Sequence, residues 1–174
     1  KQRVNLAGLV IVNAPHPAIF ASRIWSWPQI RRSWYILAFQ IPKLPEFFLG
    51  RQGASAIAKA FVSMAVDKTR FPPEVLDVYR QQARIPGALR AMVNYYRANL
   101  TFLWNTGFRL TGLIEIPTLL IWGERDTALD VNLTYGTNEL VSNLTTHYLP
   151  NVSHWAQQEA PDEVNNAIKT WLER

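Results

Sequence analysis

An acidic residue and a histidine each follow an apolar segment in the last third of the chain. Asp126 lies in the tight turn "GERD" after "PTLLIW", and His154 follows 28 residues later in "SHW". Since this interval has room for one helix and one strand, we expect both residues at the carboxyl ends of neighbouring strands. A carboxylate placed there can hold one imidazole nitrogen and leave the other free as a general base. Alone, each residue would be read as a turn aspartate or a partly buried histidine; as a pair they indicate a hydrolase.

Such a pair needs a nucleophile, and the sequence contains no nucleophile elbow of the form Gly-x-(Ser/Asp/Cys)-x-Gly. In that scheme the nucleophile precedes the acid in the chain. The upstream candidates lie within helix-patterned sequence rather than at a strand-to-helix turn; they include Ser22, Ser26, Ser33 and Asp67. His16, in "NAPHP", follows the first apolar stretch, and we expect a structural or loop role for it, with pocket lining as the alternative.

Two tyrosines lie on helix-patterned segments, Tyr35 in "SWYILAFQIPKLPE" and Tyr96 in "PGALRAMVNYYRANL". They can be ordinary aromatic residues on the buried face of amphipathic helices. A phenol that faces a pocket can instead donate a hydrogen bond to negative charge that develops on oxygen in a transition state. Both interpretations stay open from the pattern alone.

Composition excludes several classes of function. The 174 residues include no cysteine, so disulfides, thiolate metal sites and a cysteine nucleophile are absent. The net charge is +5, but the basic residues form small clusters such as Arg31–Arg32 rather than a stripe, so we expect no nucleic-acid partner. There is no signal peptide pattern, and no apolar run approaches the ~18 residues of a membrane span. We therefore expect a cytoplasmic protein.

The order of the predicted elements indicates an α/β fold. We expect strands at 4–13, 118–122 and 146–149, the first buried on both faces, because it contains a run of Leu, Val and Ile. Helices are predicted for much of 17–112, for 131–143, and for 160–174 with Val164, Ile168 and Leu172 along one face. Residues 1–16 and 113–174 then form part of a parallel-sheet core, and residues 17–112 form an inserted helical lid over the carboxyl ends of the strands.

Several segments together resemble one family. "VIVNAPHP", "WYILAFQIPKLPE", "NYYR", "PTLLIWGERD" and "NVSHWAQQEAPDEVN" are similar to the α/β-hydrolase-fold epoxide hydrolases, over nearly the whole chain. The "WGERD" and "SHW" segments occur in many α/β hydrolases, whereas a tyrosine on each of two lid helices is more particular to this family. The resemblance covers the second half of the hydrolase domain, with the last three parallel strands.

The resemblance implies a two-step hydrolysis in which an aspartate opens the epoxide and the resulting ester is then cleaved by water. Tyr35 and Tyr96 match the lid tyrosines that polarise and protonate the epoxide oxygen. His154 matches the base that activates water, and Asp126 matches the acid that orients this base. Around them, the expected substrate-binding side chains are Trp34, Trp155 and His16. The implied substrate is a small apolar epoxide, and neither a metal nor an organic cofactor is implied.

The chain departs from the family pattern because the His-Gly-x-Pro oxyanion loop and the aspartate nucleophile are both absent from the sequence. We therefore expect a C-terminal portion of an epoxide hydrolase, which has the missing N-terminal half of the core as its partner and is inactive alone. A haloacid or haloalkane dehalogenase of the same fold is an alternative, because Trp34 beside Tyr35 is suited to bind a halide. A serine esterase leaves the two tyrosines unexplained. A non-catalytic fragment that binds a ligand or a partner is the remaining alternative.

Overall fold

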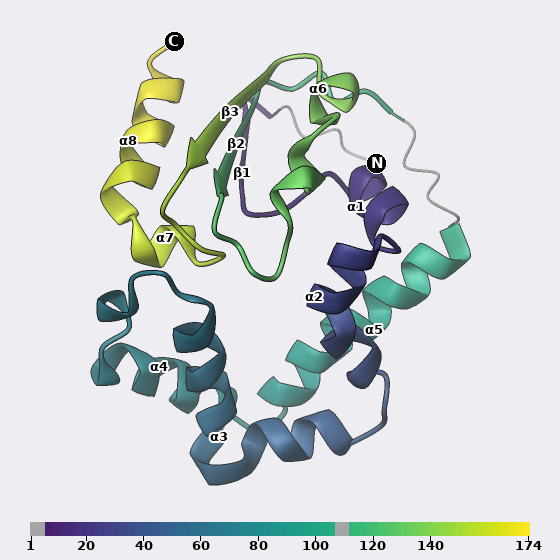
Figure 1. Cartoon of the computed structure of the whole chain (residues 1–174), viewed down its shortest axis with the longest axis vertical. Coiled ribbons are helices and arrows are strands. Elements are labelled where there is room, and N and C mark those ends of the chain that lie inside the picture. Colours follow the sequence, from purple (N-terminus) through teal and green to yellow (C-terminus); the bar gives the residue numbers. More distant parts are fainter. Residues whose placement is uncertain (1–5, 107–111) are drawn as a thin grey trace.

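The computed structural model describes residues 6–106 and 112–174. Three strands and a series of helices alternate in an α/β arrangement (Figure 1). The elements are β1 (Leu9–Val12), α1 (Pro17–Arg23), α2 (Trp27–Ala38), α3 (Leu44–Met64), η1 (Lys68–Arg70), α4 (Pro73–Ala83), α5 (Ala88–Thr106), β2 (Thr118–Gly123), η2 (Val131–Thr134), α6 (Thr137–Leu140), β3 (Leu144–Leu149), α7 (Ala156–Glu159) and α8 (Pro161–Leu172).

The three strands form one parallel sheet in the order β1-β2-β3. The register aligns Leu9 with Thr118 and Thr118 with Leu144, so that the loops after β2 and β3 leave the sheet at the same edge. Every residue of β2 is buried, as expected for a central parallel strand made of apolar residues. Asp126 and His154 follow β2 and β3, which confirms the prediction that they emerge beside each other.

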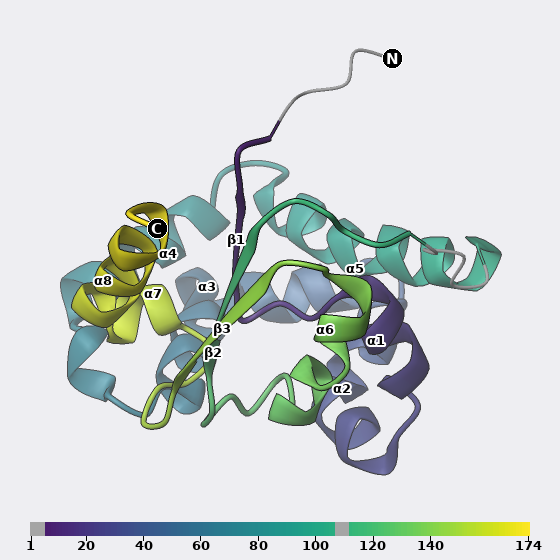
Figure 2. The ribbon, with the colours of Figure 1, turned by 90° about the horizontal axis from the view of Figure 1, so that it is seen from above.

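The sheet packs differently on its two faces, because successive side chains of a strand point to opposite sides. Leu119 and Ile121 face α8 and pack with Val164. Leu120 and Trp122 face the other way and pack against Leu133 of η2. Seen from above, the sheet lies between α7 and α8 on one side and α1 and α6 on the other (Figure 2). These two clusters hold the carboxyl ends of β2 and β3 in place.

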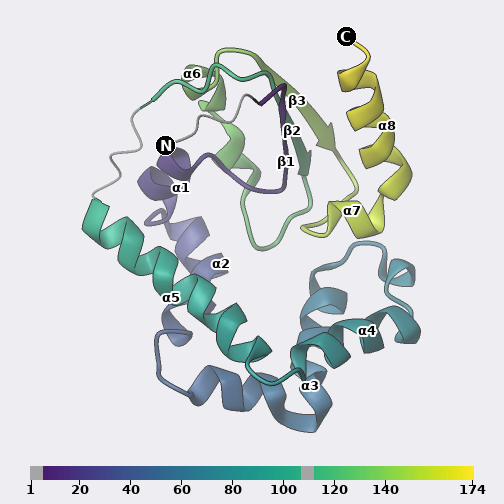
Figure 3. The same cartoon turned by 180° about the vertical axis from the view of Figure 1, so that it is seen from behind.

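All the helices from α1 to α5 lie between β1 and β2 in the chain, in agreement with an inserted helical block. We call residues 17–106 the helical segment. In Figure 1, α3 and α4 lie beyond the carboxyl ends of the strands, and Figure 3 shows α5 running beside α2 on its way back to the sheet. The boundaries at 16/17 and 112/113 stay a prediction, and residues 1–5 and 107–111 lie outside the described residues.

Four details of the predicted elements were wrong. The first strand is shorter than 4–13, and Val10 in it is 36% exposed, because β1 has a strand neighbour on one side only among the described residues. The helix predicted at 131–143 is two short pieces, η2 and α6, because Gly136 adopts a left-handed φ of 85° between them. The third strand begins at Leu144 rather than at 146. The closing helix starts at Pro161, and Leu172 on its face is 69% exposed rather than packed.

The proline-containing stretch "IPKLPEFFLG" ends in a short helix. It contributes the first turns of α3, which is broken by non-helical backbone at residues 51–54. Gln52, Gly53 and Ala54 all have positive φ there, so α3 is two helical pieces joined by a kink. Arg80 of α4 donates hydrogen bonds to the carbonyls of Gln52 and Gly53, which supports the kink from outside.

Candidate active site

Asp126 and His154 are in direct contact. The imidazole Nδ1 of His154 lies 2.7 Å from Oδ2 of Asp126, and both side chains come from loops that follow adjacent strands. The Asp126 side chain is only 1% exposed, whereas 24% of the His154 side chain is open to solvent. A buried carboxylate that holds a partly open imidazole is the arrangement that an orienting acid and a general base require.

The Asp126 carboxylate is held by three further donors. Its Oδ1 accepts hydrogen bonds from the backbone N–H groups of Ala128, at 2.7 Å, and Leu129, at 2.8 Å. Its Oδ2 accepts a hydrogen bond of 2.8 Å from the side-chain amide of Asn13. Together with His154, these donors match the roughly four lone-pair sites that a carboxylate offers. The carboxylate plane is therefore fixed before any substrate binds.

This geometry determines the imidazole tautomer. A carboxylate can only accept hydrogen bonds, so Nδ1 of His154 must carry the proton in the contact with Asp126. Nε2 then keeps its lone pair in the neutral ring and is the nitrogen available to accept a proton. The orientation and the tautomer of this imidazole are thus both set by Asp126.

Asn13 is a residue that the sequence reasoning missed. It follows β1 directly, is 4% exposed and adopts a φ of 45°, a left-handed conformation that asparagine tolerates better than most residues. Besides contacting Asp126, its side chain accepts a hydrogen bond from the N–H of Gly123 and lies 3.4 Å from the Ser153 carbonyl, to which it donates. The only signal in the sequence was an asparagine placed directly after a strand.

The two tyrosines lie together. The rings of Tyr35 in α2 and Tyr96 in α5 make an edge contact with centroids 5.6 Å apart, and Phe39 packs against both. Burial raises the pKa of Tyr35 well above its usual value, and Tyr96 and the negative charge of Asp126 raise it further. Burial, followed by the influence of Tyr95, also raises the pKa of Tyr96. Both phenols therefore stay protonated at neutral pH, and Tyr35 lies within electrostatic range of the acid.

Helix α2 is fastened to the loop that carries Asp126. The buried Gln29 amide donates to the carbonyl of Ala128, at 3.0 Å, and accepts from the N–H of Asp130, at 3.3 Å. Arg32 donates to the carbonyl of Asp126, at 2.7 Å, and forms an ion pair of 3.0 Å with Asp130. Since Tyr35 is one turn further along α2, these contacts place the phenol relative to the carboxylate. The sequence reasoning did not place Gln29 or Arg32 at the site, and it named Arg32 only as a member of a small basic cluster.

The three predicted substrate-binding residues lie in different environments. Trp34 is 66% exposed on α2, next to Tyr35. Trp155 makes an edge contact with His154, with ring centroids 4.9 Å apart, and a tilted ring contact with Phe61 of α3, with centroids 4.3 Å apart. His16 accepts a hydrogen bond of 3.2 Å from the N–H of Ala18 and so caps α1, in agreement with a structural role. Burial lowers its pKa.

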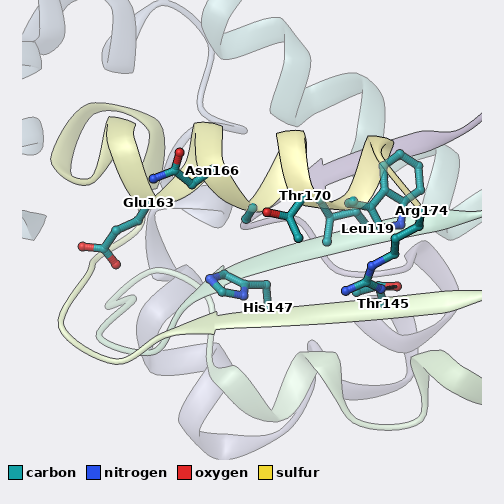
Figure 4. A pocket seen from close by; sticks show the side chains of 9 residues that line it. Leu119, Thr145, His147, Glu163, Asn166, Thr170 and Arg174 are labelled. Atoms are coloured by element: carbon teal, nitrogen blue, oxygen red, sulfur yellow. Dashed lines mark hydrogen bonds between the residues drawn. The ribbon is translucent and has the colours of Figure 1, made fainter.

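A separate groove lies between α8 and β3 (Figure 4). In it, Arg174 donates a hydrogen bond of 3.2 Å to the Thr145 hydroxyl, and Glu163 lies at the opposite end from Arg174. None of the four predicted catalytic residues lines this groove.

In the part of the chain that the structure describes, no three acidic or histidine side chains are grouped as a metal site would require. Likewise, no described helix is long and apolar enough to cross a membrane.

Comparison with known proteins finds several epoxide hydrolases that are similar to this chain. Epoxide hydrolase 1 of Caenorhabditis elegans is 31% identical over 172 residues, which are 95% of this chain and 42% of that protein. Epoxide hydrolase 4 of Mus musculus is 34% identical over 170 residues, which are 94% of this chain and 46% of that protein. The chain therefore spans about half the length of the curated relatives it matches. No family model matches the chain.

Comparison with solved structures also finds epoxide hydrolases. The epoxide hydrolase of Bacillus megaterium, solved in complex with an inhibitor, superimposes with a TM-score of 0.84 at 27% sequence identity. That superposition covers 97% of this chain and 61% of the solved chain. Sequence and fold therefore give the same answer: the chain is homologous to the epoxide hydrolases of the α/β-hydrolase fold and corresponds to the C-terminal portion of those longer proteins.

Proposed function

We propose that this chain contributes the acid, the base and the two proton-donating tyrosines of an epoxide hydrolase, which converts a small apolar epoxide and water into a vicinal diol. The observation that carries the proposal is the 2.7 Å contact between His154 Nδ1 and the buried Asp126 carboxylate. The paired, protonated phenols of Tyr35 and Tyr96 agree with it, because ring opening needs a donor to the leaving oxygen.

In the proposed first step, an aspartate outside this sequence attacks one epoxide carbon. The C–O bond of the epoxide breaks, a carboxylate ester forms, and Tyr35 and Tyr96 donate hydrogen bonds and then a proton to the released oxygen. A tyrosine with its pKa raised by burial remains a proton donor at neutral pH. The electron pair of the broken bond ends on the oxygen that becomes the first hydroxyl of the product.

In the proposed second step, Nε2 of His154 removes a proton from water, and the resulting hydroxide attacks the ester carbonyl. Asp126 stabilises the imidazolium that forms, because its buried carboxylate already accepts the Nδ1 proton. The tetrahedral intermediate collapses, and the diol leaves with the proton from His154. The aspartate is released as the carboxylic acid, and its proton returns to the tyrosinate left by the first step, so that both groups are regenerated. No metal or redox partner enters this balance.

The aspartate must come from outside these 174 residues, because the sequence holds no Gly-x-Asp-x-Gly elbow. We therefore propose that the 174-residue chain is inactive on its own and needs the other half of the hydrolase core. The test compares the purified chain with the complete product of its gene, using styrene oxide as substrate and diol formation as the readout. Robust turnover by the 174-residue chain alone would contradict this part of the proposal.

A second arm of the test separates the epoxide hydrolase from a dehalogenase of the same fold. The complete product is given fluoroacetate in parallel, and halide release without diol formation would overturn the proposal. The ester mechanism also makes a prediction for a single turnover in ¹⁸O-labelled water. The water oxygen enters the aspartate first, so the diol of the first turnover should be unlabelled; a labelled diol would show direct attack by water.

A further inference from the structure

Glu159, the last residue of α7, carries a buried carboxylate that the proposed reaction does not use. The residue is 5% exposed, and none of the ion pairs between described residues includes it. Its two oxygens instead accept hydrogen bonds from backbone N–H groups. Oε2 accepts a hydrogen bond of 2.6 Å from the N–H of Ser153, and Oε1 accepts one of 2.9 Å from the N–H of Asp67. Burying a carboxylate is costly unless such donors satisfy it, so these two hydrogen bonds account for its place in the interior.

The two donors belong to distant parts of the chain. Ser153 immediately precedes His154 and is fully buried. Asp67 lies in the helical segment, between α3 and η1, where its own side chain caps η1. A single carboxylate therefore joins the backbone next to the proposed base to a loop of the helical segment, 86 residues earlier in the sequence than Ser153.

Neighbouring contacts reinforce the same junction. Gln158 donates a hydrogen bond of 3.0 Å to the carbonyl of Arg70. The ring of Phe61 in α3 lies between Trp155 and Tyr79, with centroid distances of 4.3 and 4.1 Å. These contacts join the helical segment to the loop that carries His154 and to α7. A shift of the helical segment is therefore transmitted to this loop.

We propose that Glu159 is a positioning residue for His154, which couples the placement of the helical segment to the orientation of the imidazole. The inference rests on the proposed function for its kinetic consequence only. Without the Oε2 acceptor, the Ser153 N–H loses its partner in a buried environment, and the loop relaxes towards another acceptor or solvent. The hydrogen bond between His154 Nδ1 and Asp126 then loses its favourable geometry. A displacement of the imidazole by about 1 Å can lower the rate of the step it assists by as much as 10²-fold.

The informative substitution is Glu159→Gln, which preserves size but replaces one oxygen by a donor. Since both partners of Glu159 are N–H donors, one of them must then face the amide NH₂ group. Glu163→Gln is the matched control, because it makes the same chemical change four residues later at an exposed position of α8. Both variants are made in the complete gene product.

The kinetic readout separates the two proposed steps. In single-turnover experiments with styrene oxide, we expect Glu159→Gln to slow hydrolysis of the ester about 10–100-fold, while formation of the ester stays within about twofold of the unmodified protein. The ester should therefore accumulate in Glu159→Gln and not in Glu163→Gln. Equal slowing of both steps, or no slowing of either, would overturn the proposal.

A second readout does not depend on activity, so failure of the proposed function and failure of this inference can be told apart. The Nδ1 proton of His154 should give a resolved, strongly downfield nuclear magnetic resonance signal in the unmodified protein and in Glu163→Gln, assigned by its loss in His154→Phe. In Glu159→Gln this signal should shift or broaden. An unchanged signal would overturn the proposal.

A third measurement needs no variant, and it tests the proposed role of Glu159 even if Glu159→Gln does not fold. Amide hydrogen exchange in the unmodified protein should show the N–H groups of Ser153 and Asp67 protected and opening together, because they share one acceptor residue. Exchange of the Ser153 amide at the rate of an unprotected amide would overturn the proposal.

Discussion

The side-chain amide of Asn13 donates a hydrogen bond to Oδ2 of Asp126, the same oxygen that contacts Nδ1 of His154. Asn13 is separated from Asp126 by 113 residues and lies on the loop after the first strand of the sheet. The Asp126 carboxylate is thus positioned by loops that follow all three strands. A residue that follows β1 helps to hold the carboxylate that orients the imidazole.

Asn13→Ala should destabilise the protein by about 1–3 kcal/mol, because buried donors and acceptors lose their partner. Alanine also tolerates the left-handed backbone at this position less well than asparagine. Asn13→Gly removes the same hydrogen bonds without the backbone strain, so its loss should be smaller. Urea unfolding of the three proteins checks this order. If Asn13→Ala and Asn13→Gly were equally stable, the strain contribution would be refuted.

Asp126→Asn should lower the rate of ester hydrolysis on the order of 10³–10⁴-fold in the complete gene product. An asparagine that keeps its oxygen on the N–H groups of Ala128 and Leu129 turns its NH₂ group towards His154 and favours the wrong tautomer. Stopped-flow measurement of the two steps checks this. Asp162→Asn, at an exposed position in α8, is the control and should behave as the unmodified protein. A loss confined to ester formation would contradict the assigned role.

Tyr35→Phe and Tyr96→Phe should each lower the rate of ester formation by about 10²–10³-fold, the usual effect of removing one donor to a developing oxyanion. Ester hydrolysis should change much less, because the phenols act on the epoxide oxygen. Pre-steady-state kinetics with styrene oxide separates the two effects. Tyr95→Phe, which alters the 67% exposed neighbour in α5, is the control. Normal ester formation in the Tyr35→Phe, Tyr96→Phe double variant would remove the tyrosines from the mechanism.

The raised pKa of Tyr35 and of Tyr96 also predicts how stability depends on pH. Both phenols hold their protons more tightly in the folded state, so their contribution is complete below the ordinary tyrosine pKa of about 10 and is lost as pH rises through the folded values. Urea unfolding in the alkaline range should show this fall. The dependence should weaken in the Tyr35→Phe, Tyr96→Phe double variant. An identical alkaline fall in that variant would assign the effect to other groups.

Gly123→Ala should destabilise the protein by about 1–3 kcal/mol, the usual effect of inserting a methyl group into a packed region. A Cβ at Gly123 would lie 2.3 Å from the carbonyl oxygen of Ser153 and 2.6 Å from that of Val152, so the loop that carries His154 would have to move. Gly112→Ala, where no atom lies within 4 Å of the added Cβ, is the control and should stay within about 0.5 kcal/mol. Thermal unfolding checks both; equal stability of the two variants would mean that this close approach is not restrictive.

Patterns in the sequence were sufficient for the parts of the molecule that depend on local order along the chain. The apolar runs around residues 9–12 and 118–122 predicted parallel strands, since buried strands must be apolar on both faces. The spacing of Asp126 and His154 then placed the two at neighbouring strand ends. Where boundaries failed, as in the break at Gly136, a single residue with positive φ overrode the helical pattern.

The sequence by itself determined the fold class, the homology to epoxide hydrolases and the identity of four chemically suited side chains. Only the tertiary structure decided which groups hold these side chains in place. Asn13 donates a hydrogen bond to Asp126, and Gln29 and Arg32 form hydrogen bonds with the loop after β2. Glu159 accepts hydrogen bonds from the backbone of Ser153 and of Asp67. Apart from the contact of Glu159 with the nearby Ser153, these hydrogen bonds join residues about a hundred positions apart, and such a bond leaves no periodic trace in the chain. Such a partner becomes visible only when folding brings its donor within 3 Å of the acceptor.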